Sequence, residues 1–200
     1  DFCLSRGLGD VYKRQFLYGA ILPDILHKAI PAQRREMTHY LRHGILYGSE
    51  GDYPDIERFI IENTEILPKS QMMQGYLAHL IEDMLWFSIY IPRMTIEKDK
   101  KTIIYKKDNS VHTDDEFRND IYSDYTIMDR YLLKKTDLNI EKLQKEFLAI
   151  SDDINLKSTI KENFKLFDLR NEHLILISLD MLEAVSYTHL RAHETGRTLV

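Results

Sequence analysis

His79 and Asp83 are the two residues whose types and spacing point most directly to chemistry. They lie four residues apart in the apolar string YLAHLIEDMLWF. If this string is helical, both side chains project from one face. A charged group in such a helix is costly unless something pairs with it. A metal ion is one such partner, because imidazole and carboxylate groups are both zinc ligands.

Two more residues of ligand type lie upstream, Asp24 in the string GAILPD and His39 in MTHY. Together with His79 and Asp83 they make four side chains, the number of ligands that zinc commonly takes. We therefore expect the four to converge on a single ion. A lone histidine on an apolar helix is more often a hydrogen-bonded core residue, so a structural helical protein without metal stays an alternative.

Both ends of the chain resemble sequence from another source. Residues 5–15, SRGLGDVYKRQ, and 185–195, VSYTHLRAHET, both look like translations of the transposase adapter used in sequencing libraries. Codons can be chosen so that the DNA encoding one of these peptides is the reverse complement of the DNA encoding the other, read one frame apart. We therefore expect residues 1–15 and 185–200 to be adapter-derived and without function, and the domain between them to be N-terminally truncated.

Residues 16–184 suffice for one domain with a single core. The chain has a net charge of −5, so no basic footprint indicates a nucleic-acid partner. Its one cysteine lies in the first adapter-like end, so neither a disulfide framework nor a cysteine zinc site is expected. No apolar run approaches the roughly 20 residues that span a bilayer. These features favour a cytoplasmic protein, and they leave its oligomeric state open.

Helical periodicity dominates this domain and predicts an all-α bundle. Ser70 is the expected N-cap of a long helix, which Pro92 helps to end. Residues 48–51 are expected to form a loop, and 98–112 a loop or a small hairpin around a short β-like patch, Thr-Ile-Ile-Tyr. One expected helix ends near residue 21, and the others cover 55–67, 71–90, 115–134, 140–150 and 156–182. For the last of these, a break near 168–171 stays an alternative.

The strings GAILPD, TH and YLAHLIEDMLW, in this order, resemble the zinc-dependent phospholipase C and P1 nuclease superfamily. The chain is more narrowly similar to small bacterial proteins with a phospholipase C/D domain. The resemblance covers roughly residues 16–131, including the string DIYSDY at 120–125. It implies an all-helical bundle around one to three zinc ions, with Asp24, His39, His79 and Asp83 as ligands. It also implies that Asp24 is a candidate general base.

The chain departs from the family pattern at several ligand positions. The family uses its N-terminal amine and an early histidine, and a further histidine after the His-xxx-Asp helix, where this chain has none. His112 and Glu116 have the spacing of the family's His-xxx-Glu pair, and Asp120 and Asp124 are also four residues apart. These four are the candidate ligands of a second metal, although surface or capping roles stay open. One or two ions are therefore favoured over three.

Zinc lowers the pKa of bound water from 15.7 to roughly 7, and a carboxylate such as Asp24 can orient or deprotonate that water. The expected function is hydrolysis of a small-molecule or lipid phosphoester, with zinc or another divalent metal. The alternative is a non-catalytic, metal-stabilised helical binding protein. Tyr76 and Trp86 fall near the face of His79 and are candidate pocket residues, although such aromatics are more often core. His27 follows Asp24 by three residues and His43 follows His39 by four, so either is a candidate ligand if its segment is helical. Their polar neighbours favour exposed positions or positions behind the ligands.

Overall fold

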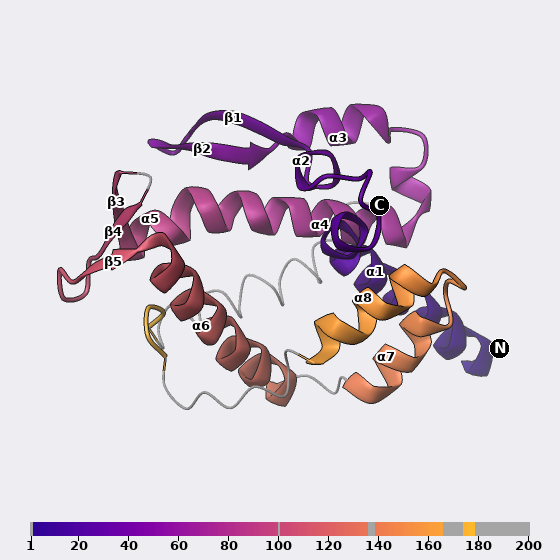
Figure 1. Ribbon diagram of the computed structural model, residues 1–200. Helices are drawn as coiled ribbons and strands as arrows, with labels where there is room; N and C mark the ends of the chain where they lie inside the picture. The colour runs from indigo at the N-terminus through magenta and orange to yellow at the C-terminus, as the bar shows by residue number, and fades with distance from the viewer. Residues whose placement is uncertain (1, 100, 136–138, 166–173, 179–200) are drawn as a thin grey trace. The chain divides into compact units, whose positions relative to one another are not determined.

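The computed structural model describes residues 2–99, 101–135, 139–165 and 174–178 (Figure 1). These residues divide into two compact units. The first holds residues 2–88 and 140–162, and the second holds the described residues among 89–139 and 163–178. The adapter-like segment 185–200 lies outside the described residues. Among the described helices, none is both long and apolar enough to cross a membrane.

The first unit is organised around two long helices, α1 (Phe2–Ala29) and α4 (Gln71–Leu85). Its core includes Phe59, Tyr76 and Leu80, all buried. The other elements of the unit are α2 (Arg35–Thr38), β1 (Leu41–Leu46), β2 (Ser49–Pro54), α3 (Ile56–Glu62), a 3-10 turn (Leu67–Lys69), α7 (Ile140–Leu148) and residues 154–162 of α8 (Ile154–Lys165).

Two glycines allow the backbones of α1 and α4 to touch. A Cβ atom on Gly75 would lie 2.0 Å from the Phe16 carbonyl oxygen, and one on Gly19 would lie 1.9 Å from that of Met72. No side chain fits at either position, so glycine is required by the packing of the two helices. This contact brings the segment after Gly19, which carries Asp24, close to the segment of α4 after Gly75.

The predicted start of the long helix is confirmed, and its end is more complex than predicted. The Ser70 hydroxyl accepts a hydrogen bond from the Met73 amide at 3.3 Å and caps α4. After Leu85 the chain forms a π-helical segment, Trp86–Tyr90, and then the short helix α5 (Ile91–Met94). Pro92 lies in the first turn of α5, two residues before that helix ends at Met94.

The all-α prediction is wrong, because the structure is mixed and contains two antiparallel sheets. Strands β1 and β2 form a hairpin in which Leu46 pairs with Ser49. The two turn residues, Tyr47 and Gly48, have φ of 51° and 82°, as a type I′ turn requires. The predicted loop at 48–51 is therefore mostly strand. Hydrogen bonds between β1 and β2 pair the backbone N–H and C=O groups here, in place of the hydrogen bonds of a helix.

The second sheet has the order β3-β4-β5 and belongs to the second unit. Its strands are β3 (Thr95–Asp99), β4 (Thr102–Tyr105) and β5 (Val111–Thr113). The β-like patch in the sequence forms β4, where Ile103 and Tyr105 are buried. Helix α6 (Asp114–Lys135) follows β5 and matches the predicted helix at 115–134. The last predicted helix is shorter than expected, because residues 174–178 are not helical. The alternative break at 168–171 lies outside the described residues.

Candidate metal centre

His39 lies at the middle of the predicted site, directly after α2, and its side chain is fully buried. Its Nδ1 atom is 2.9 Å from the Thr38 hydroxyl oxygen, which is itself 3.4 Å from the Arg35 carbonyl oxygen. The hydroxyl can donate to this carbonyl while it accepts from Nδ1–H. That pattern favours the neutral tautomer in which Nε2 carries the lone pair.

The Nε2 atom of His39 faces carboxylates from two helices. It lies 3.3 Å from Oδ1 of Asp24 on α1 and 3.8 Å from Oδ2 of Asp83 on α4. The Nε2 atom of His79 is also 3.8 Å from Asp83 Oδ2. Both Nε2 atoms are buried and neither makes a hydrogen bond. A lone pair this close to a carboxylate is unfavourable unless a proton or a metal cation lies between them.

Five side chains, His39 among them, form two overlapping groups that share His39. In each group the ligand-type atoms lie within 4.8 Å of one another. The first group is Asp24, His27 and His39, and the second is His39, His79 and Asp83. The His39 ring centroid is 5.4 Å from that of His27 and 5.2 Å from that of His79. The structure thus brings the four predicted ligands together around His39 and adds His27.

The sequence makes His27 a ligand only if its segment is helical, and the structure places it in α1. Helix α1 continues through Pro23, which is buried inside it, and ends at Ala29. Asp24 and His27 are therefore three residues apart on one helical face. The polar neighbours of His27 favoured an exposed side chain in the sequence, whereas it is half-buried in the structure.

The two carboxyl groups have opposite pKa shifts. Burial alone would raise the pKa of Asp24, but contact with His39 and electrostatic interactions with His79 and Lys28 lower it well below its usual range. Burial raises the pKa of Asp83, and the nearby Asp24 adds to this effect. Burial also lowers the pKa of His27, which favours its neutral form. Asp24 is therefore ionised at neutral pH and His27 can offer a lone pair.

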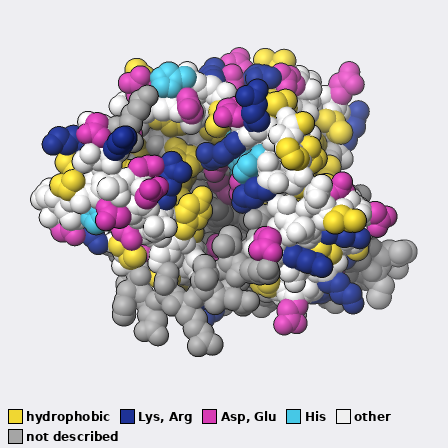
Figure 2. All heavy atoms as spheres, viewed as in Figure 1, with side chains coloured by type: hydrophobic (Ala, Val, Ile, Leu, Met, Phe, Trp, Pro, Cys, Tyr) yellow, Lys and Arg dark blue, Asp and Glu magenta, His cyan; other side chains and the backbone are white. Residues whose placement is uncertain are grey.

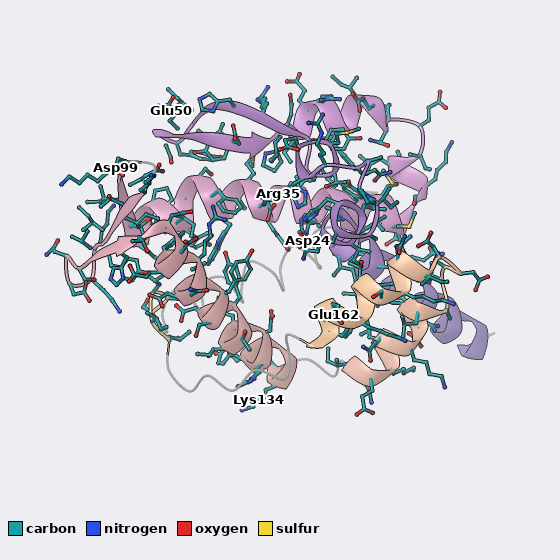
Figure 3. All side chains as sticks on the ribbon, in the orientation of Figure 1. Asp24, Arg35, Glu50, Asp99, Lys134 and Glu162 are labelled. Atoms are coloured by element: carbon teal, nitrogen blue, oxygen red, sulfur yellow. The ribbon has the colours of Figure 1, made fainter. Side chains whose placement is uncertain are left out.

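A hollow of about 220 Å³ reaches the site from outside at Asp83. Arg35 and Phe87 line it, and the Arg35 guanidinium is 3.8 Å from Asp83 Oδ2 and 5.9 Å from the centre of the Phe87 ring. Figure 3 labels Asp24 and Arg35, which α1 and α2 contribute to this region. A larger hollow of about 450 Å³, lined by side chains such as Ile60 and Ile61, includes none of the five ligand-type residues.

Asp124, a predicted ligand of a second metal, has other partners. Its carboxylate is fully buried in the second unit. One oxygen accepts the Ile175 amide at 2.6 Å, and the other accepts the amides of Leu176 and Ile177 at 2.6 and 2.8 Å. Three N–H donors stabilise the charge of this carboxylate without a metal.

The other three second-metal candidates also have protein partners. Asp120 accepts a hydrogen bond from the Tyr105 hydroxyl at 2.8 Å, and the His112 ring stacks on that of Tyr105 at 3.7 Å. Glu116 accepts the Thr113 amide at 2.7 Å in a capping box at the start of α6. Within the described part of the chain, these residues do not form a metal-ligand group.

The two predicted pocket residues lie elsewhere. The Tyr76 hydroxyl donates to the Thr38 carbonyl, and its buried ring stacks on Phe59 at 5.2 Å. Tyr76 therefore supports the segment that carries His39. Trp86 begins the π-helical segment, is half-buried and is not among the side chains that line the hollow at Asp83.

Comparisons with protein-family models, with curated proteins and with solved structures found no match to this chain. The site is therefore defined by its own geometry, as a partly buried cluster of imidazoles and carboxylates beside a small hollow. Basic and acidic side chains are interspersed over the described residues of the face in Figure 2.

Proposed function

We propose that the first unit is a metal-dependent hydrolase of phosphoesters, with Asp24, His39, His79 and Asp83 as ligands of zinc or another divalent cation. The observation that carries this proposal is the pair of buried, unbonded Nε2 atoms of His39 and His79, which face carboxylates. The resemblance of GAILPD and YLAHLIEDMLW to zinc-dependent phospholipase C supports phosphoester chemistry.

Each side chain has a role that follows from its contacts. Thr38 holds the imidazole of His39 so that Nε2 faces the ligand cluster. Ionised Asp24 accepts a hydrogen bond from the attacking water and orients it or takes its proton. Arg35, beside Asp83 at the hollow, donates hydrogen bonds to the phosphoryl oxygens. Bound zinc would lower the pKa of its water to roughly 7 and offset charge on the phosphoryl group.

The test measures zinc stoichiometry by elemental analysis and hydrolysis of a chromogenic phosphodiester on the same samples. His79→Ala and Asp83→Asn should each lose zinc and activity, because both remove a ligand from the rigid helix α4. His112→Ala is the matched control and should keep both, since its ring stacks on Tyr105 in the second unit. Arg35→Ala should keep zinc and lose roughly 10–100-fold in kcat/KM.

Two results would count against the proposal. Zinc bound equally by the wild type and by both α4 variants would show that the ligands are elsewhere. Zinc bound by the wild type with no hydrolysis of any phosphoester offered would identify a non-catalytic, metal-stabilised protein.

A further inference from the structure

One face of the sheet β3-β4-β5 carries three apolar side chains in a row. Ile104 on β4 pairs with Ile96 on β3 and with Val111 on β5, so the three side chains lie next to one another on the same face (Figure 1). Ile96 is 49% exposed and Val111 is 66% exposed, and Ile104 between them is half-buried. We call these three side chains the apolar row. Contiguous exposed apolar side chains of this kind mark an interaction surface.

The opposite face of the sheet packs against its own unit. Ile103 and Tyr105, the neighbours of Ile104 along β4, are both buried. The Tyr105 hydroxyl donates to Asp120 on α6 at 2.8 Å. Because successive side chains of a strand point to opposite faces, the apolar row lies on the face directed away from this contact with α6.

Exposed lysines lie at both ends of this sheet. Lys98 is near the end of β3 and Lys101 is just before β4, whereas Lys106 and Lys107 follow β4. These two turns are at opposite ends, because β4 is antiparallel to both of its neighbours. Within the described part of residues 93–113 there are five basic and three acidic side chains, a net charge of +2 in a chain of net charge −5.

The combination of an apolar row with lysines at both ends is complementary to an anionic lipid surface. Apolar side chains can reach the boundary between headgroups and acyl chains, while nearby lysines contact anionic headgroups. A peptide that extends a sheet binds along an edge strand, whereas the apolar row crosses the face. A second copy packed on this face would bring two sets of lysines together, which their like charges oppose.

We propose that the outer face of the sheet β3-β4-β5 docks on an anionic membrane surface, with the apolar row against the lipid and the lysines at both ends of the sheet against the headgroups. Three apolar side chains make a small contact, so the binding is weak and reversible. This inference concerns the second unit and depends neither on the metal centre nor on hydrolysis.

Co-sedimentation of the full chain with lipid vesicles tests this docking. The probes are vesicles of phosphatidylcholine alone and of an equimolar mixture of phosphatidylcholine and phosphatidylglycerol. The wild type should bind the mixed vesicles at least about 10-fold more tightly, because each lysine near an anionic surface adds to the attraction. The affinity should fall as salt is added, since salt screens these charges.

Val111→Asp tests the apolar row and should lower the affinity for mixed vesicles by about 10-fold or more, because it places a carboxylate against the lipid. Val111 is exposed, so the fold should tolerate the change, and circular dichroism checks this. Ile61→Asp on α3 is the matched control, because Ile61 is also 66% exposed but belongs to the first unit. It should change the affinity by less than about 2-fold.

A double variant, Lys98→Glu with Lys101→Glu, tests the lysines and should lower the affinity by about 10–100-fold. Lys69→Glu with Lys161→Glu is the control, since it makes the same change in net charge at exposed positions of the first unit. A smaller loss in this control than in the test pair would show that the position of the charges matters, beyond their sum.

Three results would overturn the docking surface. The first is equal binding of the wild type to the two kinds of vesicle. The second is unchanged affinity in Val111→Asp and in the double lysine variant. The third is a wild-type dimer that Val111→Asp converts to a monomer, without vesicle binding by either, which would assign this face to a second copy. The proposed function stands or falls separately, because zinc content and hydrolysis are measured without vesicles.

Discussion

Thr38 determines which nitrogen of His39 faces the carboxylates. Its hydroxyl lies 2.9 Å from Nδ1, and its carbonyl accepts a hydrogen bond from Tyr76 on α4. The Tyr76 ring in turn stacks on Phe59 in the core of the first unit. The orientation of a buried imidazole therefore depends on a hydroxyl that the metal would never touch.

Thr38→Val should weaken zinc binding by about 10–100-fold, because it keeps the shape of the side chain but removes the oxygen that holds His39 Nδ1–H. Competition with a chromogenic chelator measures this affinity. Thr64→Val is the control, since the exposed Thr64 hydroxyl lies just after α3 and donates to the Ile60 and Ile61 carbonyls of that helix. Equal zinc affinity in the wild type and in Thr38→Val would show that Thr38 does not orient the His39 imidazole for metal binding.

At the scale of elements, the site depends on the close contact of α1 with α4. Asp24 and His27 come from α1, and His79 and Asp83 from α4. The backbones can touch because Gly19 and Gly75 have no side chain. A small displacement of one helix would separate the two ligand pairs, so the glycines position the site although they contact no ligand atom.

Gly75→Ala should destabilise the first unit by about 1–3 kcal/mol, because its Cβ would meet the Phe16 carbonyl oxygen at 2.0 Å. Zinc affinity should fall as well, since the helices must move apart. Urea unfolding gives the free energy of unfolding, and calorimetry gives the affinity. Gly44→Ala on β1 is the control, because no atom lies within 4 Å of its Cβ. A Gly75 variant that matches Gly44→Ala in both measurements would contradict the argument.

The sequence predicts the helices better than the strands, and the local pairs better than the long-range contacts. Ser70 and the apolar pattern mark the start of α4, and the His79–Asp83 spacing is local. The β1–β2 hairpin has a weak sequence signal, because Tyr47 adopts a positive φ that residues other than glycine rarely adopt. The role of Asp124 could not be predicted, since its amide partners lie about fifty residues away along the chain.

At the scale of the whole molecule, each of the two units has its own buried polar centre. The first unit holds the ligand-type cluster around His39, whereas the second holds Asp124, which ties residues 175–177 to α6. All five ligand-type residues belong to the first unit. A change at Asp124 therefore tests whether metal affinity depends on the second unit.

Asp124→Asn should destabilise the second unit by about 1–3 kcal/mol, because the amide nitrogen of asparagine would face at least one of the three N–H donors and cannot accept from it. Hydrogen exchange should rise in α6 and at residues 175–177. Zinc affinity should change by less than about 2-fold, since no ligand is altered. Asp120→Asn is the matched control, because an asparagine carbonyl can still accept the single hydrogen bond from Tyr105. Loss of zinc in Asp124→Asn with unchanged hydrogen exchange in the second unit would show that Asp124 acts on the metal centre instead.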